Sequence, residues 1–141
     1  MRGGFPEPAL AASDADAQRW RSDYFSGLVR EDVLEFSRLH EVNAMRLFAE
    51  MLRSRVGSPL SIASMARDLQ LAPSTLGKYL DILEALFIVF IVRPWHRNIA
   101  RATLQAPKVY FFDTGLVIGD EGIKFENLVA CHLLKQVQWQ Q

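Results

Sequence analysis

The 141-residue sequence has one cysteine, Cys131, and its 16 lysines and arginines are matched by 16 aspartates and glutamates. One cysteine excludes an intramolecular disulfide, and a formal net charge of zero provides no global attraction to nucleic acids or membranes. The longest apolar run, residues 85–92, is far shorter than the roughly 20 residues that a membrane-spanning helix needs. The first residues also lack the apolar segment of a secretory signal. We therefore expect a cytoplasmic protein without a membrane partner.

Half of the residues are hydrophobic and 23% are charged, a balance typical of a domain with a packed core. Cys131 is expected to be a structural thiol, because neighbouring residues on a helix, here His132, point in different directions and cannot activate it. The three histidines, His40, His96 and His132, fall in separate predicted elements. We expect no metal site and no cofactor.

Residues 1–40 are assigned to an N-terminal connector followed by helices. Two glycines and two prolines within residues 1–10 indicate an extended connector. Ser13 is a suitable cap for the first helix, and a second short helix is predicted over residues 31–38.

Residues 41–112 are predicted to form a winged helix-turn-helix domain. A helix over residues 41–56 ends near Gly57, and Ser61 caps the next one. Residues 70–73 form a tight joint, after which Ser74 or Thr75 caps a helix whose apolar face ends at Phe87. Segments 88–92 and 108–112 are β-branched and aromatic, as strands are. The expected fold is mainly α with a small β-wing, flanked by N-terminal helices and a C-terminal helix.

The domain contains a candidate nucleic-acid interface with two parts. In a helix-turn-helix, the N-terminal residues of the second helix reach base edges in the major groove. Residues 85–112 carry four basic residues and no acidic one, so a wing there suits DNA phosphates. The candidate residues are Ser74, Thr75, Lys78 and Tyr79 for bases, and Arg93, Arg97, Arg101 and Lys108 for phosphates.

Other interpretations remain open for the same residues. Lys78 is the second helix's single basic residue, with Asp81 and Glu84 after it, so the unit also suits a structural spacer or protein-binding module. Residues 72–79 superficially resemble a phosphate loop, but they lack its first glycine and the hydroxyl residue after the lysine. Asp113 is expected to bond the backbone of Gly115 in a turn.

Several motifs together resemble a known family. They are Gly-Gly-Phe-Pro-Glu-Pro at residues 3–8, the leucine-rich helix-turn-helix at residues 69–84, Pro-Lys-Val-Tyr-Phe-x-Asp-Thr-Gly-Leu at residues 107–116, and Gly-x-x-Phe-Glu-Asn-x-Val at residues 122–129. The sequence is similar to the C-terminal domain of unknown function that follows the ATPase core in a family of prokaryotic AAA-type ATPases. The most specific family positions are Asp113, Gly115, Glu126 and Asn127.

The resemblance implies a winged helix followed, at residues 113–141, by the first helix of a lobe that resembles restriction endonucleases. The chain is expected to be a fragment without the ATPase core, and not an enzyme, because it has no phosphate-loop motif. Double-stranded DNA is the first expected partner, and the leading function is a non-catalytic, DNA-binding module. The alternative is a module that docks on an ATPase core or on a second copy. A third interpretation is a residual metal-dependent nuclease lobe that uses Asp113 and Glu126. No small-molecule substrate is evident.

Overall fold

Two helices organise the N-terminal part of the chain, α1 (Pro6–Ala9) and α2 (Asp14–Leu34). The structure is a computed structural model that describes residues 4–34, 39–95 and 106–139. The Ser13 hydroxyl accepts a hydrogen bond from the Asp16 backbone N–H at 3.1 Å, which confirms the predicted cap. The separate helix predicted over residues 31–38 is wrong as far as Leu34, because no proline interrupts α2 before that residue. Residues 35–38 lie outside the described residues.

The third helix, α3 (Leu39–Arg53), carries the centre of the core. Met45, Phe48, Ala49 and Leu52 recur at three- and four-residue steps and are fully buried, as the apolar periodicity predicts. The helix ends at Arg53, three residues before the predicted end. Gly57 has a φ of +73° in the turn that follows, a conformation that glycine adopts without strain.

Two short helices come next, α4 (Ile62–Asp68) and α5 (Pro73–Ala85). Ser61 caps α4 as predicted, by accepting a hydrogen bond from the Ser64 backbone N–H at 3.3 Å. The cap predicted for α5 is wrong. Its N-cap is Ala72, because Pro73 occupies the first helical position and already has the backbone angle that a helix start requires.

A two-stranded antiparallel sheet follows the helices. Strands β1 (Val89–Val92) and β2 (Lys108–Phe111) pair from Val89 opposite Phe111 to Val92 opposite Lys108. The other edge of β2 is covered by an extended segment, since Gly57 N–H donates to the Val109 carbonyl at 3.3 Å and Pro59 forms a bridge to Lys108.

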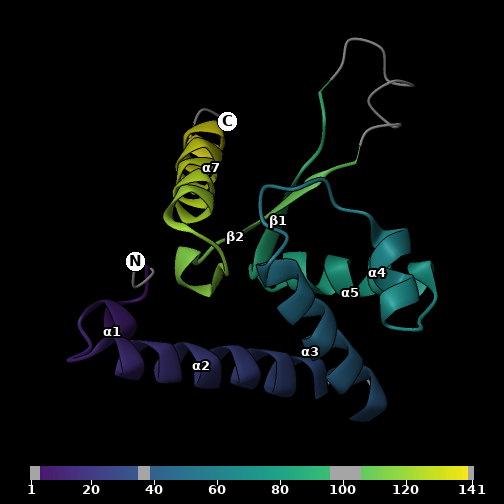
Figure 1. Ribbon diagram of the computed structural model, residues 1–141, viewed down its shortest axis with the longest axis horizontal. Helices are drawn as coiled ribbons and strands as arrows, with labels where there is room; N and C mark the ends of the chain where they lie inside the picture. The colour runs from purple at the N-terminus through teal and green to yellow at the C-terminus, as the bar shows by residue number, and fades with distance from the viewer. Residues whose placement is uncertain (1–3, 35–38, 96–105, 140–141) are drawn as a thin grey trace.

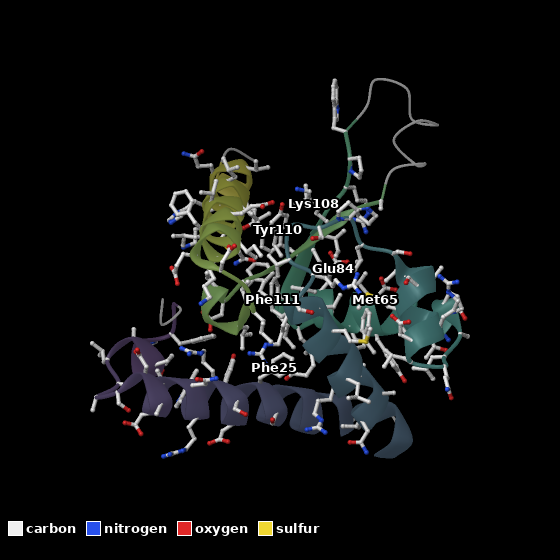
Figure 2. The ribbon with its side chains drawn as sticks, viewed as in Figure 1. Phe25, Met65, Glu84, Lys108, Tyr110 and Phe111 are labelled. Carbon is white, nitrogen blue, oxygen red and sulfur yellow. The ribbon has the colours of Figure 1, made fainter. Side chains whose placement is uncertain are left out.

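The chain then makes a short 3-10 turn, η1 (Thr114–Leu116), and ends in α7 (Glu121–Trp139). Figure 1 shows α7 on one side of the strands and α4 on the other, with α2 running along the bottom of the view. The core lies between these elements, and Phe25, Met65 and Phe111 contribute to it from α2, α4 and β2 (Figure 2). The protein is therefore mainly helical with a small antiparallel sheet. Within the described ranges, no helix combines the length and apolar character that crossing a membrane requires.

Candidate nucleic-acid interface

A four-residue turn sets the angle between α4 and α5. Gln70 has a φ of +55°, and the Leu71 N–H donates to the Ala66 carbonyl at 2.9 Å. These contacts close the end of α4, while Met65 and Ala66 on α4 and Leu76 on α5 are buried on the inner side. The N-terminal turn of α5 is consequently held in a fixed position at the surface.

The four candidate base-contacting residues divide between the surface and the core. Ser74 and Lys78 are exposed and lie one helical turn apart, and Thr75 is half-buried. Tyr79 is buried, with 6% of its surface exposed, so its ring packs in the core and not on the outer face of α5. Its position follows from the spacing, because Leu76, Tyr79 and Leu83 occupy the same helix face.

The predicted wing is described in part. Arg93 is exposed just after β1, whereas Arg97 and Arg101 lie outside the described residues. Lys108 begins β2, and its Nζ lies 3.3 Å from Oε1 of Glu126 on α7. One of the four candidate phosphate contacts thus already has an acidic partner within the chain.

Glu84 has a structural role that its sequence position does not reveal. Its Oε1 accepts a hydrogen bond from the Ile91 backbone N–H at 3.2 Å, which ties the end of α5 to β1 (Figure 2). This carboxylate therefore serves the junction between helix and strand.

The Asp-Thr-Gly-Leu and Phe-Glu-Asn motifs meet where α7 contacts β2. Asn127 is fully buried, and its Oδ1 accepts from the Phe111 N–H at 2.8 Å. Its Nδ2 donates to the Phe111 carbonyl and to Thr114 Oγ1, both at 2.9 Å. One side-chain amide therefore satisfies both backbone groups of Phe111, as a neighbouring strand would.

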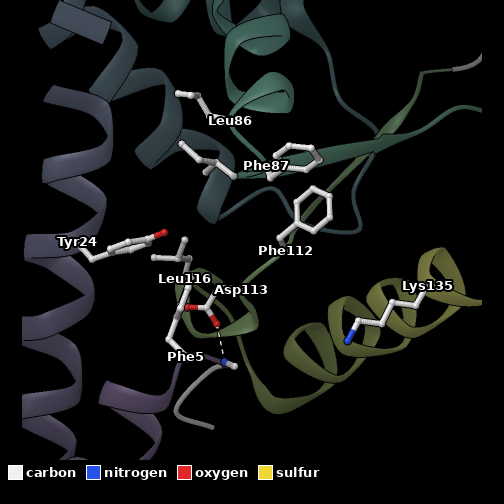
Figure 3. Close-up of a pocket in the computed structure, with 10 residues that line it drawn as sticks. Phe5, Tyr24, Leu86, Phe87, Phe112, Asp113, Leu116 and Lys135 are labelled. Atoms are coloured by element: carbon white, nitrogen blue, oxygen red, sulfur yellow. Dashed lines mark hydrogen bonds between the residues drawn. The ribbon is translucent and has the colours of Figure 1, made fainter. Parts of the chain in front are cut away.

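Asp113 is a turn former, as the sequence predicts. Its Oδ1 accepts from the backbone N–H of Gly115 at 3.0 Å. The same oxygen accepts from the backbone N–H of Gly4 at 2.9 Å, a bond drawn in Figure 3. The second bond connects the N-terminal segment to the end of β2, a contact across 109 residues that no local pattern indicates. The cavity of about 270 Å³ drawn there is lined mostly by aromatic and aliphatic side chains.

Glu126 has different partners from Asp113. The Tyr110 hydroxyl donates to Glu126 Oε1 at 2.8 Å, and this hydrogen bond, followed by the nearby Lys108 ammonium, lowers the pKa of Glu126. Burial, together with the Glu126 carboxylate, raises the pKa of Tyr110 to about 12. The described residues contain no group of three or more His, Cys, Asp or Glu side chains able to hold a metal ion.

Cys131 is half-buried and donates to the Phe111 carbonyl, with Sγ 3.2 Å from the oxygen. Burial raises the pKa of its thiol, which reduces the reactive thiolate form. His132 is exposed beside it. The geometry fits a structural thiol.

No sequence pattern pointed to Arg53, whose side chain joins three elements. Its Nε donates to the Leu116 carbonyl at 2.7 Å, and its Nη1 pairs with Glu50 at 2.8 Å. Its guanidinium also lies over the Phe25 ring, 5.8 Å from the centroid. The contacts with Leu116 and Phe25 connect α3 to η1 and α2, and both depend on residues distant in sequence.

Comparisons of the sequence with known proteins show to which family the chain belongs. The chain is 33% identical over 117 residues to an uncharacterized protein of Mycobacterium tuberculosis and to one of Mycobacterium bovis. Each match covers 83% of the chain but 26% of the relative, so the chain spans about a quarter of the length of these curated relatives. No solved structure matches it significantly. A family model for a domain of unknown function matches residues 1–124, and the chain belongs to this family, DUF8612.

Proposed function

We propose that residues 41–112 form a winged helix that binds double-stranded DNA without catalysis. The observation that carries the proposal is the exposed first turn of α5, held by the tight joint after α4 and followed by a hairpin of two strands. This order of elements fits a helix-turn-helix followed by a wing, and Pro59 adds a third extended segment to the hairpin.

In this proposal α5 enters the major groove with its N-terminal end. Ser74 and Lys78 reach base edges, and Thr75 lies beside them. Tyr79 supports the helix from inside and contacts no base. Arg93, Arg97 and Arg101 contact DNA phosphates. Lys108 also contacts a phosphate while it stays close to Glu126.

Fluorescence anisotropy with labelled duplex DNA, at low and near-physiological salt, tests the proposal. We expect non-specific binding at roughly 10⁻⁴ to 10⁻⁶ M that weakens steeply with salt. Replacing Arg97 and Arg101 together by Ala should weaken binding similarly for all sequences and reduce the salt slope by about two. Lys78→Gln should also weaken binding, whereas Lys135→Gln on α7 is the matched control. Absence of binding at low salt, or an equal loss in the control, would refute the assignment.

We further propose that the module works beside an AAA-type ATPase core in longer proteins. The support is the motif resemblance and the greater length of the relatives. The sequence contains no phosphate loop, so the chain alone should release no phosphate from ATP in a colorimetric assay.

A second candidate function is self-association through α7. Phe125, Val129, Leu133 and Val137 recur every four residues and are exposed by 61, 40, 57 and 56%. An antiparallel pair of α7 helices would place Phe125 against Val137 and Val129 against Leu133, so this stripe is complementary to a second copy of itself. Light scattering should then show a mass that rises with concentration. Leu133→Glu should abolish the rise while Gln136→Glu keeps it, and a strict monomer at high concentration would contradict this function.

A further inference from the structure

A polar cavity of about 270 Å³ lies between α2, the end of α3, the η1 turn and the start of α7. Three cationic side chains line it, Arg21, Arg53 and Lys124, together with the uncharged donors Gln18 and Ser22. No carboxylate is among its lining residues in the described part of the chain. The elements that form the cavity include neither α4 nor α5, so the site is separate from the proposed DNA interface.

The sequence places these donors together for simple geometric reasons. Arg21 and Ser22 follow Gln18 by three and four residues, so both lie next to Gln18 on one face of α2. Arg53 is the last residue of α3, and Lys124 lies in the first turn of α7. Three helices thus contribute positive charge to one space, although the chain as a whole is neutral.

Arg53 is held in position before any ligand arrives. Its bonds to the Leu116 carbonyl and to Glu50 use Nε and Nη1. Its Nη2 has no hydrogen-bond partner among the described residues. A fixed, planar guanidinium with free N–H donors is the group that proteins use to bind oxygen atoms of phosphates in a defined geometry.

The acidic neighbours reduce the positive charge only in part. Lys124 lies 3.7 Å from Glu121, whose side chain is 75% exposed, and such surface pairs are weak because water screens them. Glu50 pairs with Arg53 from a half-exposed position. Neither carboxylate lines the cavity, so an anion there approaches Arg53 and Lys124 without facing Glu50 or Glu121 directly.

We propose that this cavity binds a small phosphate-bearing anion, either free phosphate or the phosphate end of a nucleotide. Its volume is just below the roughly 300–1,000 Å³ of pockets for drug-sized ligands, which suits a small charged group. Arg53 supplies a planar guanidinium in a fixed position, and Arg21 supplies a second guanidinium. Lys124 supplies an ammonium group on a flexible side chain. Gln18 and Ser22 complete the set of donors from α2.

Isothermal titration calorimetry in a chloride buffer tests the site, with inorganic phosphate, pyrophosphate and ATP as separate probes. We expect saturable binding of one anion per chain. Tighter binding of ATP than of pyrophosphate would identify a nucleotide as the ligand, and equal affinities of all three would identify the phosphate group alone. Saturable heat from none of the probes would overturn the proposal.

Variants locate the binding. Arg21→Gln and Lys124→Gln should each weaken binding about tenfold or more, because each removes a charged donor. Arg19→Gln on the same α2 helix and Lys135→Gln on α7 remove the same charge away from the cavity and should change the affinity little. An equal loss in these controls would indicate general charge attraction and refute the site. Arg21→Lys, which keeps the charge, should bind better than Arg21→Gln.

Discussion

At the scale of single residues, Asn127 joins α7 to the sheet. Its amide bonds both backbone groups of Phe111 and the hydroxyl of Thr114, all in a buried environment. Leucine at this position would have a similar size but would leave the Phe111 N–H without its partner and the Phe111 carbonyl with the Cys131 thiol alone. The family motif marked this residue, yet its role depends on contacts 13 and 16 residues away.

Asn127→Ala should therefore lower the free energy of unfolding by about 2 kcal/mol or more, since buried donors and acceptors without partners are costly. Urea denaturation followed by circular dichroism measures this change. Gln136→Ala, at an exposed position of the same helix, should shift stability by less than about 0.5 kcal/mol. Similar curves for the two variants would show that Asn127 does not hold this junction.

The Tyr110–Glu126 hydrogen bond makes stability depend on pH. The pKa of Glu126 is lowered in the folded chain, so its contribution is present above the ordinary value of 4.5 and is lost as the pH falls through the lowered value. Tyr110→Phe removes the main cause of that shift. The melting temperature of this variant should consequently fall less than that of the unchanged chain between neutral and acidic pH, whereas Tyr24→Phe should follow the unchanged chain.

At the scale of elements, the sequence predicted the start of a helix or a turn correctly where a hydrogen bond between neighbouring residues determines it. The caps at Ser13 and Ser61 and the turn at Asp113 are formed by side chains bonding backbone a few residues away. The C-terminal end of α2 and the cap of α5 were predicted wrongly. The first helix continues as far as Leu34, and Pro73 starts α5 ahead of the predicted caps.

The candidate interface was harder to predict than the elements that carry it. A helix has two faces, and residue type alone placed Tyr79 outward although its position aligns it with Leu76 and Leu83. The pairing of Lys108 with Glu126 joins residues 18 positions apart on different elements. The sequence shows which residues between the strands are charged, but the pairing of Lys108 depends on how α7 packs.

Replacing Gly57 or Gly77 by alanine is expected to change the stability of the chain in opposite directions. Gly57 has a φ of +73°, and a Cβ there would lie 2.8 Å from the Glu126 carboxylate, so Gly57→Ala should destabilise the chain by about 1 kcal/mol or more. Gly77 lies inside α5 with nothing within 4 Å of the added atom, so Gly77→Ala should stabilise by about 0.4–1 kcal/mol. Thermal melts of both variants measure the two shifts, and shifts of the same sign would contradict this account.

At the scale of the whole molecule, the chain presents two surfaces with different physical character. Lys78 on α5 and Arg93 after β1 are exposed and charged, whereas the outer stripe of α7 is apolar. Charged contacts with phosphates weaken as salt rises because released counterions lose their entropic advantage. Contacts between apolar side chains do not depend on screening. Salt concentration therefore distinguishes the two proposed functions within one molecule.

Raising the salt from about 50 mM to about 200 mM should weaken DNA binding by orders of magnitude if several phosphates are contacted. The average mass at high protein concentration should stay the same or rise, because association through Val129 and Leu133 buries apolar surface. Anisotropy and light scattering on the same samples measure both responses. A mass that falls together with DNA affinity would show that the association of chains is electrostatic, and would place its interface away from the apolar stripe of α7.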